Sequence, residues 1–159
     1  MGMELRFHCG CGYGLSAQTG IGMNYPYLCR EILEAMQSGE YGPNVREFAN
    51  TAPHPGIFTD GKLYRCAQCG HLRNEPALSL CTPIGPYRKP TVPFCSWMDP
   101  EEQLPYVMEA DLGTDWQEVL SRKHPCACGA EMEPVEDLNA VPCPRCGQLL
   151  NMQTDMMWD

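Results

Sequence analysis

Cys9-Gly10-Cys11-Gly12 is the first of four cysteine pairs in this chain that are each followed directly by a glycine. Two short turns that each present two thiolates are the simplest way to give a tetrahedral ion four soft ligands. Such turns commonly need a positive φ after the second cysteine, which glycine adopts without steric cost. The sequence therefore predicts two four-cysteine metal sites. Their ligands would be Cys9, Cys11, Cys66, Cys69, Cys126, Cys128, Cys143 and Cys146.

The spacing of the pairs alternates along the chain as C-x-C-G, C-x2-C-G, C-x-C-G and C-x2-C-G. This order is typical of a duplicated unit whose first copy has gained an insertion between Gly12 and Arg65. Closing a loop within one copy needs no link between the copies. We therefore expect Cys9 and Cys11 to share a metal ion with the pair at 66–69, and the pair at 126–128 to share one with the pair at 143–146.

The segment Cys143-Pro144-Arg145-Cys146-Gly147 resembles the C-P-x-C-G knuckle of the zinc-ribbon superfamily and of rubredoxins. The two patches at about 5–82 and 124–153 also resemble the knuckles of uncharacterised bacterial CpXC-type zinc-ribbon proteins. One departure is that both leading pairs are C-x-C where most ribbons have C-x2-C. His8 stands where C-x2-C spacing would place a first ligand, so it is an alternative to Cys9.

Zn2+ in two closed structural sites is the reading we favour for these cysteines, with iron as the less favoured alternative. Iron would make the chain a rubredoxin-like electron carrier, and free dithiols would make it a thiol oxidoreductase. The count of eleven cysteines is odd, which argues against a disulfide scaffold. Three cysteines lie outside the pairs: Cys29 on an apolar helical face, and Cys81 and Cys95 beside a proline-rich segment. His71 is a candidate hydrogen-bond donor to a thiolate.

Charge is shared unevenly between the two parts of the chain. Residues 1–98 carry 8 Lys+Arg against 7 Asp+Glu, and residues 99–159 carry 3 against 13, which together give the net charge of −9. Phosphate repels the acidic part, so nucleic acid would have to bind through Tyr64, Arg65, Arg73, Tyr87, Arg88 and Lys89. We favour a protein partner, which the acidic stretch 99–118 and the apolar tail Met156-Met157-Trp158 could contact. No stretch approaches a membrane span, and no apolar signal run opens the chain, so we expect a cytoplasmic protein without membrane contact.

The predicted fold class is α+β, with two zinc-ribbon units of short antiparallel strands. The first unit would carry a helical insertion, with one helix from about Asn24 to Gly39 and another opened by a capping box at Asn44-x-x-Glu47. Asp60-Gly61 predicts a two-residue hairpin turn. Spacing of Trp116, Val119 and Leu120 predicts a helix from Thr114 to about Arg122. The expected domains are a ribbon at 1–82, a proline-rich acidic linker at 83–110, and a short helix with the second ribbon and tail at 111–159.

No acid, base or nucleophile grouping stands out, so an enzyme is the less favoured class. The sequence favours a zinc-binding, non-enzymatic protein-interaction module. A nucleic-acid-binding or transcription-associated zinc ribbon and a rubredoxin-like electron carrier are the alternatives.

Overall fold

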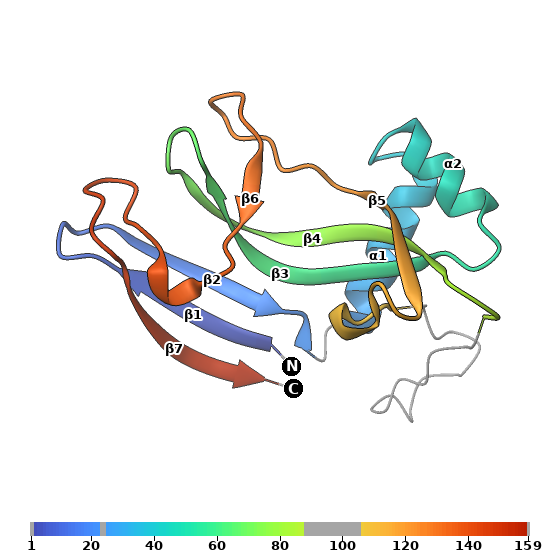
Figure 1. Ribbon diagram of the computed structural model, residues 1–159, viewed down its shortest axis with the longest axis horizontal. Helices are drawn as coiled ribbons and strands as arrows, with labels where there is room; N and C mark the ends of the chain where they lie inside the picture. The colour runs from blue at the N-terminus through green and yellow to red at the C-terminus, as the bar shows by residue number, and fades with distance from the viewer. Residues whose placement is uncertain (1, 23–24, 88–105, 159) are drawn as a thin grey trace. The chain divides into compact units, whose positions relative to one another are not determined.

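The computed structural model describes residues 2–22, 25–87 and 106–158. The described chain forms, in order, β1 (Gly2–His8), β2 (Gly14–Gly20), α1 (Tyr25–Ser38), α2 (Pro43–Thr51), β3 (Gly56–Cys66), β4 (Leu72–Pro83), β5 (Trp116–Ser121), β6 (Met132–Pro134) and β7 (Asn151–Trp158). Short 3-10 turns lie at Glu109–Asp111 and Leu138–Ala140. The strands belong to one sheet with the order β5-β4-β3-β2-β1-β7, and β6 pairs with β3 (Figure 1).

The predicted fold class, two separate ribbon units joined by a linker and a helix, is wrong. The strands that leave and enter the cysteine turns are parts of a single sheet. Two of these strands are long: β3 has 11 residues and β4 has 12. Because they run well beyond the cysteine turn that joins them, the short strands of a small ribbon become a larger, mainly antiparallel sheet.

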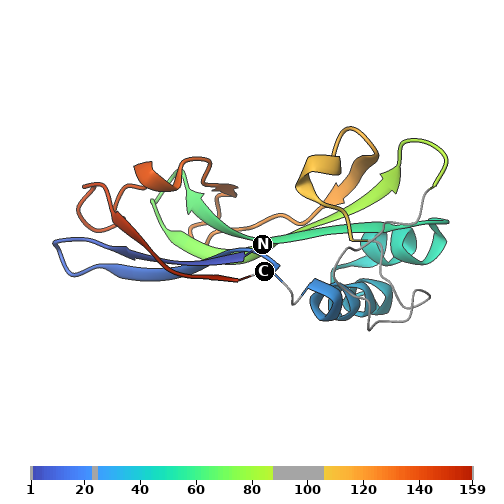
Figure 2. The same ribbon diagram turned by 90° about the horizontal axis from the view of Figure 1, so that it is seen from below.

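The chain divides into two compact units, each built from segments that are distant in sequence. Unit 1 consists of Met1–Met23, Asp60–Ala77 and Lys123–Asp159, and unit 2 consists of Asn24–Thr59 and Leu78–Arg122. In unit 1, β1 lies between β2 and β7, and an apolar cluster forms around Leu5, Phe7, Ala17, Leu63, Leu72, Val141 and Leu150. In unit 2, α1 and α2 lie next to each other (Figure 2), and the cluster contains Ile32, Met36, Ala49, Ile57, Leu78 and Leu80.

The hairpin predicted at Asp60-Gly61 is wrong, because both residues lie inside the continuous strand β3. A type I′ turn would need positive φ at Gly61, and Gly61 is absent from the positive-φ glycines of the described residues. Its lack of a side chain serves another purpose. Gly61 pairs with Gly20 of β2, and a Cβ placed on it would lie 2.4 Å from the carbonyl oxygen of Gln18. The glycine therefore permits close backbone approach between β2 and β3.

The helix predicted from Thr114 to Arg122 is also wrong, since residues 116–121 form strand β5. Their aromatic and β-branched side chains favour a pleated surface as well as they fit helical spacing. Pairing with β4 decides the outcome: Leu120 lies opposite Leu80 and packs against the unit 2 cluster. Thr114 belongs to a turn, in which its hydroxyl donates to the carbonyl oxygen of Asp111.

The two helices of the insertion are confirmed, with one change at the second. Helix α1 ends at Ser38 and is followed by Gly39 with φ +96°. Helix α2 begins at Pro43, with Gly42 as N-cap and no side-chain cap hydrogen bond. The predicted capping box at Asn44 and Glu47 does not form, because the helix begins at Pro43 and Asn44 therefore lies inside the first turn, not at the N-cap.

Candidate metal centres

The four cysteine turns, which we call the first to fourth knuckles (9–12, 66–70, 126–129 and 143–147), share one backbone arrangement. In each, the glycine N–H donates to the carbonyl of the first cysteine, at 2.9 to 3.0 Å. The N–H of that cysteine donates to the carbonyl of the residue after the glycine, at 2.7 to 2.9 Å. The trailing glycines all have positive φ: 83° at Gly12, 72° at Gly70, 91° at Gly129 and 77° at Gly147. The glycine after each pair is thus required by the turn, as the sequence predicts.

The knuckles bring the eight paired cysteines together in two groups of four that could each hold a metal ion. Cys9, Cys11, Cys143 and Cys146 form what we call the outer centre. Cys66, Cys69, Cys126 and Cys128 form the inner centre. The predicted pairing within each sequence copy is therefore wrong: the first knuckle joins the fourth and the second joins the third. Each centre still combines one C-x-C-G turn with one C-x2-C-G turn.

The sulfur positions fit a tetrahedral ion. Within each centre all four sulfurs lie within 4.8 Å of one another. In the outer centre the sulfurs are 3.4 Å apart for Cys9–Cys146 and 3.6 Å apart for Cys11–Cys143. In the inner centre, Cys66–Cys128 and Cys69–Cys126 are both 3.5 Å. Four metal–sulfur bonds of about 2.3 Å would place the sulfurs about 3.8 Å apart, so each group could close around an ion with shifts of a few tenths of an ångström.

Strand pairing explains why the centres cross between copies. Strand β1 runs into the first knuckle and pairs with β7, which follows the fourth knuckle, with His8 opposite Asn151. Strand β3 runs into the second knuckle and pairs with β6, which follows the third, with Cys66 opposite Met132. In both centres, then, the strand that enters one knuckle is bonded to the strand that leaves its partner.

The entropy of loop closure favours pairing within copies, but its free energy is small compared with that of metal binding. Cys11 and Cys143 are 132 residues apart, and Cys69 and Cys126 are 57 apart. Relative to pairing within copies, the two closed loops are longer by factors of about two and four, which costs about 2 kcal/mol in total. A structural zinc site supplies an apparent ~10 to 16 kcal/mol, and strand pairing adds to it. The entropic preference for short loops is too small to set the pairing.

Burial follows the same rule in every knuckle: the first cysteine is buried and the second is exposed. Two of the buried sulfurs, those of Cys66 and Cys143, have lowered pKa values. The Cys69 N–H lowers the pKa of Cys66 to about 6, with desolvation acting against it. At Cys143 desolvation opposes ionisation, but the N–H groups of Arg145 and Cys146 lower its pKa to about 7; the Arg145 nitrogen lies 3.4 Å from the sulfur.

The exposed cysteines stay protonated in the absence of an ion. Each accepts an N–H from the residue two positions on, which favours the thiolate, but the neighbouring sulfurs outweigh it. Cys126 and Cys66 raise the pKa of Cys69 to about 12, and Cys9, desolvation and Cys11 do the same at Cys146. The pKa values of Cys11 and Cys128 are also raised, by desolvation and adjacent sulfurs. Four thiolates at this separation need a cation to offset their mutual repulsion.

A polar network that sequence reasoning missed holds the third knuckle to the β3–β4 hairpin. His124 is buried, and its Nδ1 lies 2.7 Å from Glu75 Oε2 while its ring stacks on Tyr64 at 3.9 Å. Arg73 forms an ion pair with Glu75 at 2.8 Å and donates to the carbonyl of Pro125 at 3.1 Å. No local sequence pattern signals this role, because the partners of His124 are distant in sequence.

The remaining predicted candidates lie apart from the cysteine groups. His8 is exposed on β1, and Cys9 occupies the ligand position. The ring of His71 is exposed, and the knuckle uses its backbone carbonyl. Cys81 is fully buried, and desolvation followed by the Glu118 carboxylate raises its pKa to about 12, so it is an unreactive thiol. Cys95, Arg88 and Lys89 fall outside the described residues, as does the side chain of Cys29.

In the structure, the two tyrosine rings of the predicted aromatic and basic patch stack on histidine rings. Tyr64 is buried beneath His124, and Tyr87 stacks on His54 with ring centroids 3.9 Å apart. Arg73 is occupied by Glu75. Of the described members of the patch, both Arg65 and Arg73 have a buried Nε without a hydrogen-bond partner, and for Arg65 no ion pair accompanies it.

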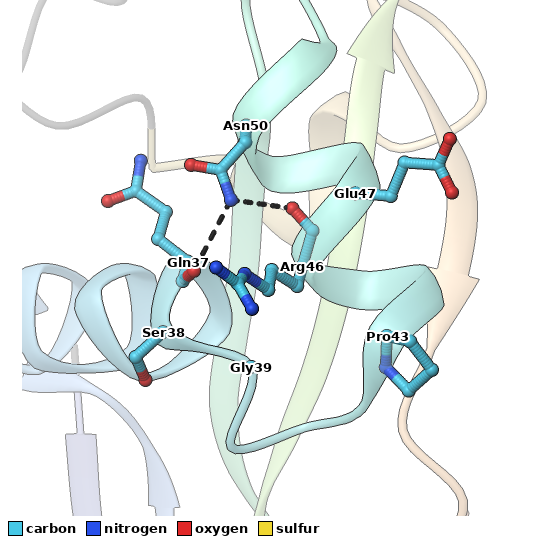
Figure 3. Close-up of a pocket in the computed structure, with 7 residues that line it drawn as sticks. All are labelled: Gln37, Ser38, Gly39, Pro43, Arg46, Glu47 and Asn50. Carbon is cyan, nitrogen blue, oxygen red and sulfur yellow. Dashed lines mark hydrogen bonds between the residues drawn. The ribbon is translucent and has the colours of Figure 1, made fainter.

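An open pocket of about 650 Å3 lies at α1 and α2, lined by Gln37, Ser38, Gly39, Pro43, Arg46, Glu47 and Asn50 (Figure 3). The Asn50 side-chain nitrogen donates to the carbonyls of Arg46 at 2.8 Å and Gln37 at 3.3 Å. These bonds tie the two helices together and leave the pocket walls exposed. None of the residues that line the pocket is a cysteine.

Comparison with known protein families, curated proteins and solved structures finds no match for this chain. The two four-cysteine groups are zinc-ribbon-like on their own geometry. In the part of the chain that the structure describes, neither helix has the length and apolarity needed to cross a membrane.

Proposed function

We propose that this chain is a non-enzymatic, zinc-binding interaction protein of the zinc-ribbon kind, with one Zn2+ in the outer centre and one in the inner centre. The observation that carries the proposal is the arrangement of eight sulfurs in two compact groups with nearly tetrahedral spacing. The ligands would be Cys9, Cys11, Cys143 and Cys146, and Cys66, Cys69, Cys126 and Cys128. Reduced thiols are needed at both centres, which supports a cytoplasmic location.

Zinc suits these groups better than a catalytic metal would. Four cysteine ligands fill the tetrahedral coordination of Zn2+ and leave no position for water or substrate. The ion would supply cross-linking between distant chain segments. Iron also accepts four thiolates and would turn the same centres into electron carriers.

Metal analysis of protein purified without added metal tests the assignment. We expect two zinc ions per chain and a colourless solution. A red protein with two iron ions and thiolate-to-iron absorption would replace the zinc assignment with electron transfer. Fewer than two ions per chain after reconstitution under reducing conditions would contradict the two-centre arrangement.

Two surface features support a protein partner over nucleic acid. Strand β7 pairs with β1 on one side, and its Met156 and Met157 are 59 % and 67 % exposed. Exposed apolar side chains on a terminal strand of a sheet offer both contact area and backbone groups to another chain. The stacked rings of Tyr64 and Tyr87, by contrast, offer fewer free faces to bases.

Binding to single-stranded DNA and RNA at low and high salt tests this preference. We expect no saturable binding at physiological salt. Salt-sensitive binding that is lost when Arg88 and Lys89 are both changed to Glu would establish the nucleic-acid alternative instead.

A further inference from the structure

We propose that Arg65 is a shared counter-cation for both metal centres and sets the metal affinity of the outer centre as well as the inner one. This inference rests on the proposed function, because it assumes that both centres bind a divalent ion. It concerns a residue outside the cysteine motifs.

The guanidinium of Arg65 lies beside the second knuckle, and Arg65 shares a pocket wall with Val141 and Pro142, which precede the ligand Cys143. Arg65 directly precedes the ligand Cys66 at the end of β3. A Cβ built on Gly70, in the second knuckle, would lie 3.8 Å from the Arg65 Nη2 atom and 3.9 Å from the Cα of Pro144, in the fourth knuckle. The same glycine thus adjoins the Arg65 guanidinium on one side and the backbone of the outer centre on the other.

Arg65 also has an unsatisfied polar atom, which calls for an explanation. Its Nε is buried and has no hydrogen-bond partner in the described structure. The Nε of Arg73 also lacks a hydrogen bond, but that side chain forms an ion pair with Glu75. Arg6 pairs with Asp155, and Arg145 lies over the Tyr13 ring. A buried donor without a partner is costly, and negative charge nearby lowers that cost.

The walls around Arg65 make a dissolved anion a poor candidate for that charge. Arg65 lines a pocket of about 310 Å3 together with Glu133 and Asp137, and Glu133 lies opposite it across the β3–β6 pair. An entering anion would meet these two carboxylates. It would also meet two loaded centres, each with four thiolates and one divalent ion and hence a net charge of −2.

Glu133 and Asp137 offset part of the Arg65 charge, and the thiolate centres would add further negative charge beside it. A guanidinium near two dianionic groups stabilises the deprotonated ligands of both, and an arginine keeps its charge at any pH at which the protein is folded. Groups around the ligands commonly tune metal affinity by 10- to 100-fold. Arg65 would act on both ions at once because it adjoins both knuckles.

Chelator competition read by thiol labelling measures the two centres separately. Zinc-loaded protein is incubated with increasing chelator and a pulse of alkylating reagent, and mass spectrometry scores the exposed ligands. Labelling of Cys11 and Cys146 reports the outer centre, and labelling of Cys69 and Cys128 reports the inner one. The wild-type chain is compared with Arg65→Lys, Arg65→Met and Arg65→Glu. Arg6→Met is the matched control, because Arg6 is a strand arginine of unit 1 whose charge is paired with Asp155.

We expect the zinc affinity of both centres to follow the charge at position 65, with Lys close to wild type, Met weaker by about 10-fold, and Glu weaker still. A role in packing alone would leave Lys and Met alike, since their stems are similar, and this result would overturn the proposal. Loss confined to the inner centre would also overturn it, as would an equal loss in Arg6→Met. Circular dichroism of each zinc-loaded variant before chelation checks the fold, and the conservative Lys variant provides the comparison if Glu fails to fold. Failure of the wild-type chain to bind two ions would instead count against the proposed function.

Discussion

The sulfurs of Cys11 and Cys143 lie 3.6 Å apart although 132 residues separate them in the chain. The outer centre thus joins opposite ends of the described chain, next to the pairing of β1 with β7. The inner centre closes entirely within that loop. This nested order makes predictions that pairing within the sequence copies would not.

Replacing Cys143 by Ser should release one zinc ion and expose the first knuckle. Cys11 shares its centre with Cys143, so its alkylation should rise to the rate of an unfolded thiol, while Cys69 and Cys128 stay protected. Metal analysis and site-resolved labelling provide the measurement. Cys66→Ser is the matched variant and should show the reverse pattern. Exposure of Cys126 and Cys128 in Cys143→Ser, with Cys11 still protected, would restore the pairing within copies.

Removal of both ions should unfold the cysteine-bearing segments before the helices. Unit 1 depends on two ions that each supply an apparent ~10 to 16 kcal/mol, whereas unit 2 has its own apolar cluster. Amide hydrogen exchange after chelation should therefore show loss of protection in β1, β6 and β7 first. Protection in α2 and in the Leu78–Thr82 part of β4 should persist longer. Simultaneous loss everywhere would mean that the ions hold both units.

Zinc binding should release at least two protons per ion at about pH 8. In the metal-free protein, the pKa of Cys66 is about 6 and that of Cys143 about 7, so both are already thiolates. Cys69 and Cys146, with pKa values of about 12, and Cys11 and Cys128, with raised pKa values, must lose protons to bind. Affinity should fall as pH is lowered, first through the four protonated thiols and then more steeply below about pH 7, where Cys143 and Cys66 also take up protons.

Titration calorimetry in buffers of different ionisation enthalpy gives the number of protons directly. A value near zero at pH 8 would mean that all eight sulfurs are thiolates before the metal arrives. That result would contradict the raised pKa values of the four exposed cysteines.

Substitution of Gly61 by Ala should destabilise the protein by about 1 to 3 kcal/mol, because the added Cβ would lie 2.4 Å from the Gln18 carbonyl oxygen of the adjacent strand. Gly85→Ala is the control, since a Cβ there has nothing within 4 Å. Urea denaturation of the zinc-loaded proteins compares the two. Equal midpoints would show that β2 and β3 can separate at this point without cost.

The knuckles could be predicted from the sequence because their chemistry is local. A C-x-C-G or C-x2-C-G turn fixes the ligand type and the positive φ of residues such as Gly70 within a few positions. Strand β1 and the two helices likewise follow from short-range pattern. His124 carries no such signal, because its contacts with Glu75 and Tyr64 arise only when the hairpin is assembled.

Long-range pairing is where the prediction from sequence failed. Nothing near Cys9 distinguishes the second knuckle from the fourth as its partner, and the difference in loop entropy is only about 2 kcal/mol. The register of β1 on β7 makes the choice. The local pattern at Asp60-Gly61 fits either a hairpin turn or a continuous strand, and pairing with β2 favours the strand. The pattern around Trp116 fits either a helix or a strand, and pairing with β4 favours the strand.

The nested centres also bear on how the protein is made. Ribosomes add roughly 5 to 20 residues per second, so the 132 residues between Cys11 and Cys143 take about 7 to 26 s to synthesise. The inner centre can acquire its ion first, while Cys9 and Cys11 lack the other two ligands of their centre. During that interval they are available to oxidants and to competing soft metals. The last knuckle to emerge therefore determines whether the first two cysteines of the chain reach their native ligand set.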